Sequence, residues 1–121
     1  MGFFMTDNVI LVKSKAFAVR IVRLYQYLTD AKKEFVLSKQ LLRSGTSIGA
    51  NVIEANSSQS KREFIAKMNV ALKEAAESEY WLELLYEGHY LSEGEFSSIF
   101  VDCNELNKIL ISIIKKSNAN K

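Results

Sequence analysis

The fold is decided by residues 37–85, which read LSKQLLRSGTSIGANVIEANSSQSKREFIAKMNVALKEAAESEYWLELL. Apolar residues recur there at three- and four-residue spacing, the period of one helix face. Ser38 is a suitable N-cap, Ser60 and Glu63 have the spacing of a capping box, and Gly88 is a suitable C′ glycine. We therefore predict helices over 38–57 and 60–87.

The predicted core stripes of these two helices are made of apolar residues on one face. They are Leu41, Ile48, Val52 and Ala55 in the first, and Ile65, Met68, Leu72, Ala75, Leu82 and Tyr86 in the second, widened by Phe64, Ala71 and Leu85. Gly45 and Gly49 interrupt the first helix, where each costs about 1 kcal/mol against alanine. We expect a neighbouring backbone to approach closely at these two glycines.

Two outer helices are predicted by the same periodicity, over 14–29 and 93–116. Their stripes are Phe17, Ile21, Leu24 and Leu28, then Phe96, Ile99, Cys103, Leu106, Leu110 and Ile113. Ser92 and Glu95 form a second capping-box pattern, and residues 117–121 are expected to fray. Short connections favour antiparallel neighbours. The sequence thus predicts an all-α, antiparallel up-down-up-down four-helix bundle in one domain, 1–121.

Composition excludes several other classes. The chain has 121 residues, no proline and five glycines, which disfavours a turn-rich β fold. One cysteine excludes an intramolecular disulfide, and one cysteine with one histidine cannot supply a Cys/His zinc site, so no metal is expected. No apolar run approaches the length of a membrane span, and no secretory signal is evident. We expect a cytoplasmic protein.

The net charge of +2 conceals a strong segregation. Residues 1–73 carry a balance of +7, residues 74–107 carry −9 with no Lys or Arg at all, and residues 108–121 carry +4. Such blocks suit either a polyanion site or pairing between basic and acidic elements, within the bundle or between subunits. The near-cancellation of the blocks favours pairing.

A polar stripe runs along the first of the central helices. It consists of Ser44, Ser47, Asn51, Glu54 and Ser58. Serine and asparagine are poor helix formers, so this is not an ordinary solvated face. The stripe is either a functional polar site or a buried hydrogen-bonded seam with Arg43 near Glu54; the seam is the favoured interpretation.

The last two turns of the second central helix are apolar on nearly every side. A helix that is apolar all round is buried all round. We therefore expect a partner chain to cover Tyr80, Trp81 or Leu84.

Catalysis is the least supported function class. His89 lies in a predicted loop and Cys103 in a core stripe, so nothing pairs a nucleophile with a base. No phosphate-binding or dinucleotide pattern is present, and no cofactor is expected. We predict that the chain is not an enzyme.

The central run also carries a family resemblance. The segments 41–44 (LLRS), 47–54 (SIGANVIE), 60–64 (SKREF), 71–74 (ALKE) and 79–82 (EYWL) resemble the bacterial four-helix-bundle family associated with 23S rRNA intervening sequences. The resemblance covers most of the chain and implies a compact bundle that assembles into a homopentameric ring. The family is also similar to accessory proteins of diversity-generating retroelements, which form basic barrels that engage reverse transcriptase and RNA. No catalytic residues carry over.

Two hypotheses follow. The first is a non-catalytic oligomeric interaction protein, with a protein partner conceivable. The second is an RNA-binding accessory protein that uses a basic patch on a ring. The basic positions that match the family are Lys39, Arg43, Lys61, Arg62 and Lys67.

Overall fold

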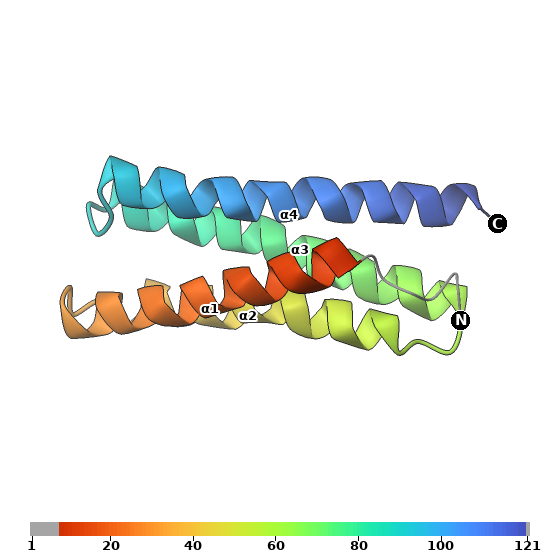
Figure 1. Ribbon diagram of the computed structural model, residues 1–121. Helices are drawn as coiled ribbons and strands as arrows, with labels where there is room; N and C mark the ends of the chain where they lie inside the picture. Colours follow the sequence, from red (N-terminus) through yellow and green to blue (C-terminus); the bar gives the residue numbers. More distant parts are fainter. Residues whose placement is uncertain (1–7, 121) are drawn as a thin grey trace.

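The computed structural model describes residues 8–120, which form four antiparallel helices and contain no strand. The helices are α1 (Asn8–Asp30), α2 (Leu37–Asn56), α3 (Lys61–Glu87) and α4 (Glu93–Ala119). Each helix packs against the next along the chain, and α4 returns beside α1 (Figure 1). The predicted all-α, up-down-up-down four-helix bundle is confirmed.

The outer helices are longer than the sequence predicted. Helix α1 begins at Asn8 rather than near residue 14, and α4 continues to Ala119 through most of the expected frayed tail. The first turns of α1 hold Ile10, which is fully buried. Tertiary burial of that side chain stabilises a helix start that has no acidic residue in its first turn to favour it.

The core is formed by the predicted stripes with small changes of register. All four apolar residues predicted for α2 are buried together with Gly45 and Gly49. In α3 the buried face is shifted toward Ala71, Ser78 and Leu85, and Ile65 and Leu72 lie at its edge. In α4 the central members of the stripe, Ile99 to Leu110, are buried.

Helix α2 is capped by a side chain that the sequence analysis overlooked. The N-cap position is Val36, which makes no side-chain cap, and the predicted cap Ser38 lies inside the helix. The carboxylate of Glu34 instead accepts hydrogen bonds from the backbone N–H groups of Val36 (3.1 Å), Leu37 (2.9 Å) and Ser38 (2.7 Å). Burial raises the pKa of Glu34, but these three donors outweigh burial, and the net pKa is lowered.

The predicted caps of α3 and α4 are partly confirmed. Ser92 and Glu95 form the predicted capping box. Ser60 accepts from the Glu63 N–H, but the Glu63 carboxylate accepts from Gln59 rather than from Ser60. Gly88 has φ −82°, so it is not the left-handed C′ residue expected; His89, at φ 69°, takes that conformation.

The two glycines of α2 face α1, as a close approach requires. A Cβ on Gly49 would lie 3.4 Å from Ser14 Oγ and 3.5 Å from the Ser14 carbonyl oxygen. A Cβ on Gly45 would lie 2.8 Å from Cγ1 of Ile21, so here the neighbour is a side chain and not the expected backbone. Either way, α1 and α2 pack closely.

Candidate interaction surfaces

The polar stripe of α2 is divided between the α2–α3 contact and the surface. Ser44 is fully buried, and its Oγ lies 2.8 Å from Ser78 Oγ on α3. Each hydroxyl also lies within hydrogen-bond distance of a carbonyl of its own helix, Ser78 of Glu74 (2.9 Å) and Ser44 of Leu41 (3.4 Å), and either hydroxyl can donate to the other. Ser44 therefore forms a hydrogen bond across the two helices in the interior.

The rest of the stripe bonds within α2 or to solvent-facing partners. Ser47 donates to the Arg43 carbonyl (2.7 Å), and the Asn51 amide donates to the Ser47 carbonyl (2.9 Å). Glu54 is exposed and pairs with Lys67 at 2.8 Å. Ser44 and Ser58 are thus the buried members of the stripe, and the Ser58 hydroxyl donates to the Glu54 carbonyl (3.4 Å).

Arg43 links α2 to two carboxylates of α3. Its guanidinium lies 3.2 Å from Glu74 Oε1 and also donates to Glu77. The expected approach of Arg43 to Glu54 is therefore wrong, because the guanidinium is directed across to α3 rather than along its own helix.

The two carboxylates of this cluster differ in pKa. Burial raises the pKa of Glu74, and the neighbouring Glu77 adds to that rise against the attraction of Arg43. The hydrogen bond from Arg43 lowers the pKa of Glu77. The indole N–H of Trp81 also contributes to this lowering, although its buried Nε1 does not reach hydrogen-bond geometry with any described residue. The arrangement joins a cation, an acidic pair and an aromatic ring on one side of α2–α3.

The five basic candidates are not brought together in one patch. Lys39 lies in the first turn of α2, whereas Lys61 and Arg62 lie in the first turn of α3. Because α2 has 20 residues, roughly 30 Å separates these two ends. Arg43 and Lys67 are engaged with carboxylates; the hydrogen bond to Glu54 raises the pKa of Lys67.

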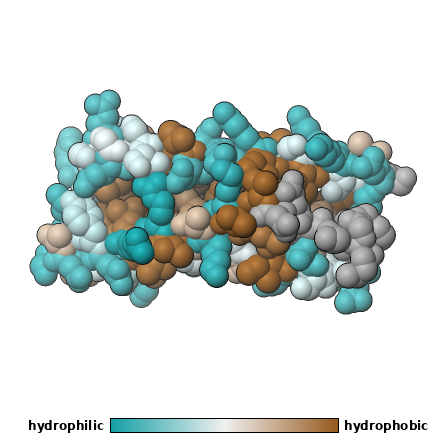
Figure 2. Space-filling model, viewed as in Figure 1, coloured by the Kyte–Doolittle hydropathy of each residue, from teal (hydrophilic) through white to brown (hydrophobic). Residues whose placement is uncertain are grey.

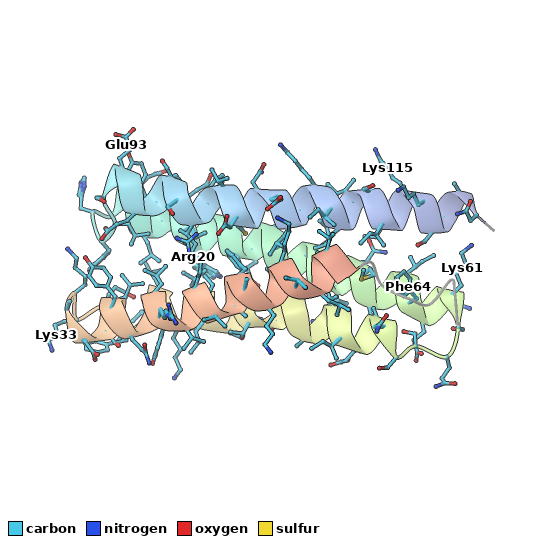
Figure 3. All side chains as sticks on the ribbon, in the orientation of Figure 1. Arg20, Lys33, Lys61, Phe64, Glu93 and Lys115 are labelled. Atoms are coloured by element: carbon cyan, nitrogen blue, oxygen red, sulfur yellow. The ribbon has the colours of Figure 1, made fainter. Side chains whose placement is uncertain are left out.

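One end of the bundle gathers cations that the candidate set did not include. Lys61 and Lys115 lie at the same end of the molecule, where α3 begins and α4 ends (Figure 3). Arg62 and Lys116 are their neighbours in sequence and are exposed. The signal for these cations was present in the sequence as the basic block after residue 107, but only the antiparallel pairing of α3 and α4 places Lys115 at the same end of the bundle as Lys61 (Figure 3).

The apolar end of α3 is only partly covered by the bundle. Leu82 and Leu85 are fully buried, and Tyr86 stacks on Phe96 of α4 with ring centroids 4.6 Å apart. Tyr80 is 53% exposed and meets Trp81 edge-on at 5.2 Å. Leu84 and Trp81 are half-buried. Helix α4 therefore covers part of the apolar surplus that the sequence suggested, and Tyr80 stays open.

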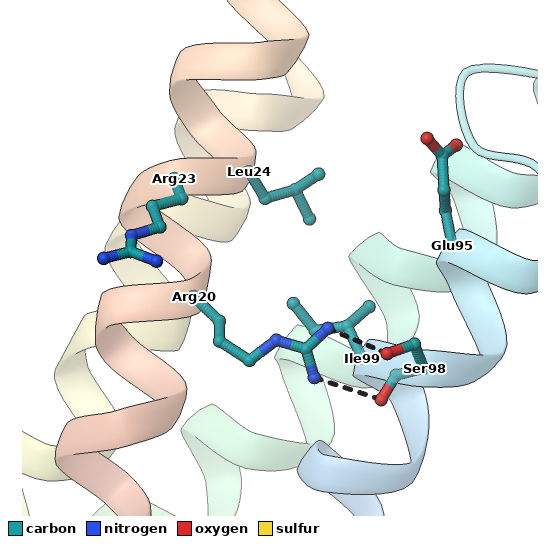
Figure 4. A pocket seen from close by; sticks show the side chains of 6 residues that line it. All are labelled: Arg20, Arg23, Leu24, Glu95, Ser98 and Ile99. Carbon is teal, nitrogen blue, oxygen red and sulfur yellow. Dashed lines mark hydrogen bonds between the residues drawn. The ribbon is translucent and has the colours of Figure 1, made fainter.

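The α1–α4 seam is held by polar side chains. Arg20 donates to Ser98 Oγ at 2.9 Å and to the Ser98 carbonyl at 3.2 Å (Figure 4). Arg20 also pairs with Asp102 at 2.5 Å, and Lys13 pairs with Glu105 at 3.0 Å. A hollow of about 380 Å³ lies beside Arg20, Leu24 and Ser98. Sequence analysis missed these pairs, although Lys13 and Arg20 are two turns apart and Asp102 and Glu105 one turn apart.

A second hollow, of about 540 Å³, lies on the outer side of α1 and α2. Its lining is mainly aliphatic or small and includes Val12, Ala18, Ala50 and Ile53. Figure 2 shows apolar side chains reaching the surface of the bundle on the side where α1 lies in front. Val12 is 67% exposed and Ile53 59% exposed. This surface was absent from the sequence-based candidates.

The comparisons with known proteins agree with this fold. Residues 6–112 match the family described as 23S rRNA-intervening sequence protein. The chain belongs to this family. It is similar to a crystal structure from Bacteroides thetaiotaomicron VPI-5482, described as a protein with unknown function from the S23 ribosomal protein family. The two chains are 59% identical with a TM-score of 0.90, over 92% of this chain and 99% of that one. No curated protein matches the chain.

The part of the chain that matches the 23S rRNA-intervening sequence protein family contains all of α1, α2 and α3. The Arg43 cluster, the open Tyr80 ring and the hollow beside Ile53 all lie within it. Lys115 and Lys116 lie beyond it, in the last turns of α4. The basic end of the bundle therefore combines residues inside and outside the matched region.

Groups with reactive chemistry are isolated from one another. Cys103 is buried, its Sγ lies 3.4 Å from the Ala75 carbonyl oxygen, and burial raises the pKa of its thiol far above the ordinary value. His89 lies in the α3–α4 connection, before α4 begins at Glu93. Cys103 lies about 15 Å further along the axis of α4, since the helix rises 1.5 Å per residue. Among residues 8–120 no three His, Cys, Asp or Glu side chains are grouped to hold a metal, and no helix is long and apolar enough to cross a membrane.

Proposed function

We propose that this member of the 23S rRNA-intervening sequence protein family is a non-catalytic interaction protein that works as a homo-oligomer in the cytoplasm. The observation that carries the proposal is the open aromatic surface of α3, where Tyr80 is 53% exposed against Trp81. Aromatic side chains are enriched in protein interfaces because they bury much area at low entropic cost. The pentamer implied by the family resemblance is part of this proposal.

Charge pairing within one chain supports an interface built on apolar contact. Three of the cations in the basic block, Lys13, Arg20 and Arg43, pair with carboxylates of the acidic block. Part of the charge segregation is thus satisfied inside the bundle. A partner would meet a surface of exposed apolar groups with a reduced set of unpaired charges.

We infer the absence of catalysis from the surroundings of the chain's one cysteine, Cys103, and its one histidine, His89. A thiol whose pKa is raised by burial holds too little thiolate to attack a substrate. The exposed His89 shares its connection, residues 88–92, with the hydroxyl groups of Tyr90 and Ser92, and Ser92 is engaged as the N-cap of α4.

The test is the solution mass of the purified chain at micromolar concentration, by light scattering after gel filtration. We expect a multiple of the 13.7 kDa protomer, five for a pentamer. Tyr80→Glu should lower that mass while the far-UV circular dichroism stays helical, because Tyr80 is exposed. Asn69→Glu, an exposed polar site on the same helix, is the matched control and should leave the mass unchanged. A parent protein that runs as a monomer would defeat the proposal.

A second candidate function, RNA binding, is favoured by the basic end of the bundle. Lys61 and Arg62 make no ion pair with any residue between 8 and 120, and they begin α3, where the helix dipole favours phosphate. Lys115 and Lys116 add charge from α4. In a homo-oligomer several such ends would act together through multivalency.

Binding to RNA should weaken steeply as salt rises, since each phosphate contact releases a counterion. The experiment titrates nuclease-treated protein against structured ribosomal RNA and a scrambled competitor, from low to physiological salt. The double variant Lys61→Glu, Arg62→Glu should abolish binding, whereas Lys39→Glu, at the other end of α2, should retain most of it. Equal loss in both variants would argue against a site at this end.

A further inference from the structure

The bundle exposes two apolar surfaces that lie on diagonally opposed helices. The first, here named the α1/α2 patch, consists of Val12, Val19, Val22 and Ile53. The second, here named the α3 patch, consists of Val70, Tyr80, Trp81 and Leu84. Helices α1 and α3 are diagonal because each packs chiefly on α2 and α4. The two patches therefore face different directions and cannot cover one another within one chain.

The α1/α2 patch is concave and has a basic rim. It includes the hollow of about 540 Å³, whose floor is formed by small residues such as Ala18, Gly49 and Ala50. Lys15 lines this hollow. Arg23 follows Val22 of the patch along α1; it borders the α1–α4 hollow, but its side chain is directed away from α4, unlike that of Arg20 (Figure 4). Neither cation forms an ion pair with any residue between 8 and 120. Helix α1 carries no acidic residue before Asp30.

The α3 patch presents an exposed aromatic ring and has an acidic rim along its last turns. The Tyr80 ring stands edge-on to Trp81 at 5.2 Å and is 53% exposed. Glu83 and Glu87 are exposed, and at three and seven residues after Tyr80 they lie on the neighbouring side of the same helix. Lys73 is exposed between Val70 and Tyr80, so the acidic rim is confined to the last turns of α3, where Glu83 and Glu87 have no Lys or Arg after them up to residue 107.

We propose that the α3 patch of one copy docks into the α1/α2 patch of a second copy. The inference rests on the proposed homo-oligomer and names its contact. The two patches are complementary in two respects: an exposed aromatic side chain meets an apolar hollow, and the acidic side chains that end α3 meet the unpaired cations of α1. Complementary rims also steer association and fix its register.

Such a contact is heterologous, because it uses two different surfaces. A copy that engages one neighbour through one patch keeps its other patch free for a second neighbour, so the assembly closes into a ring or extends. An isologous dimer, made by two α3 patches or by two α1/α2 patches, would instead place like-charged rims together, which costs affinity.

The test is complementation between two variants with one damaged patch each. Ile53→Glu damages the α1/α2 patch and Tyr80→Glu damages the α3 patch; both side chains are more than half exposed, so the bundle should still fold. We expect each variant alone to be monomeric. An equimolar mixture should form a 1:1 dimer at twice the protomer mass, since each variant retains the patch that the other lacks. Light scattering and native mass spectrometry, with one variant mass-tagged, measure this directly.

Each other outcome overturns the inference in a recognisable way. If one variant keeps the parent mass while the other is monomeric, the contact is isologous. If the mixture of the two variants stays monomeric, the two patches do not meet. The same conclusion follows if both variants keep the parent mass. In all of these the parent is still an oligomer and the proposed function survives. A monomeric parent protein would overturn both the inferred contact and the proposed function. Helicity by circular dichroism guards against misfolding, and Val12→Glu provides a second variant of the α1/α2 patch.

A charge exchange tests the rims separately. Two double variants are compared with the parent: Lys15→Glu with Arg23→Glu, and Glu83→Lys with Glu87→Lys. Each should self-associate more weakly than the parent, and its self-association should be less sensitive to salt. The chain that carries all four changes should associate again, because the rims are reversed together. Failure of the fourfold variant to recover association, with its helicity intact, would overturn the pairing of these rims.

Discussion

The α2–α3 pair and the α1–α4 seam are built in different ways. Helices α2 and α3 share the most extensive contact in the bundle, through buried apolar residues and the buried Ser44–Ser78 hydrogen bond. Helices α1 and α4 make the least extensive contact of neighbouring helices, with exposed ion pairs across a hollow. Packing holds one side of the bundle and long polar side chains hold the other. The α1–α4 seam is therefore where the bundle should open first.

The largest expected difference is in the loss of stability when a leucine is truncated in the α2–α3 pair or at the α1–α4 seam. Leu41→Ala, at a fully packed position of α2, should lower the free energy of unfolding by about 2–5 kcal/mol, because no atom can move in to fill the cavity. Leu24→Ala, at the edge of the α1–α4 hollow, should cost about 1 kcal/mol, since solvent already reaches the site. Urea unfolding followed by circular dichroism measures both. Equal losses would contradict the comparison.

A methyl group added between α1 and α2 tests how tightly the packed side is filled. Gly45→Ala should destabilise the protein by about 1–3 kcal/mol, because the new Cβ would lie 2.8 Å from the branched Ile21 side chain. Gly94→Ala is the matched control: it meets nothing within 4 Å and should be neutral or slightly stabilising. Thermal unfolding of the two variants side by side gives the answer. A Gly45→Ala protein as stable as the parent would mean that Ile21 can shift freely.

The entry to α2 should make the packed side sensitive to acid. Glu34→Gln removes the charged acceptor of three N–H groups and should cost about 0.5–2 kcal/mol at neutral pH. Because the folded pKa of Glu34 is lowered, its contribution is present above the unfolded value of about 4.3 and is lost as the pH falls through the folded pKa. The stability of the variant should thus fall less steeply below pH ~4.3 than that of the parent.

The control for this experiment is Glu93→Gln, at an exposed site in the first turn of α4. It should leave the acid limb of the stability curve close to that of the parent. Identical pH profiles for Glu34→Gln and the parent would show that the cap is not ionised in the folded state.

The smallest expected effect concerns the ion pairs of the α1–α4 seam. Arg20→Ala and Lys13→Ala should each cost less than about 1 kcal/mol, because both pairs are about half exposed. The loss should shrink further at 1 M salt, where exposed charges are screened. Unfolding at two salt concentrations tests this, with Lys108→Ala as control, because Lys108 of α4 is exposed and forms no ion pair with any residue between 8 and 120. A large, salt-independent loss for Arg20→Ala would mean that the seam depends on this side chain for packing.

The fold was predictable because helical periodicity is a local property. The stripes around Ile48 and Leu106 needed only the spacing of apolar residues, and the capping box at Ser92 needed only two side chains three residues apart. The start of α1 was not predictable, since Asn8 is followed by residues without a capping pattern, and the burial of Ile10 depends on helices far along the chain. The cap at Glu34 was missed because a carboxylate several residues ahead of a helix has no fixed spacing to it.

The candidate surfaces divide in the same manner. Trp81 and Tyr80 were found because seven residues of one helix held too many apolar side chains for one face. The basic candidates were taken from one continuous part of the chain, and α2 places Lys39 and Lys61 at opposite ends of the bundle. The α1/α2 patch could not be found, because Val12 and Ile53 are apolar residues like those of a core until the packing of α1 on α2 leaves them outside.

By itself the sequence determined the class of the fold, the family and the segregation of charge, because these depend on residue type and on spacing along one helix. Tertiary structure alone decided which charges are neutralised, as with Arg43 between Glu74 and Glu77, and which apolar residues stay open. The physical reason is that ion pairing and burial depend on distances between helices, and those distances are fixed only when all four helices pack together.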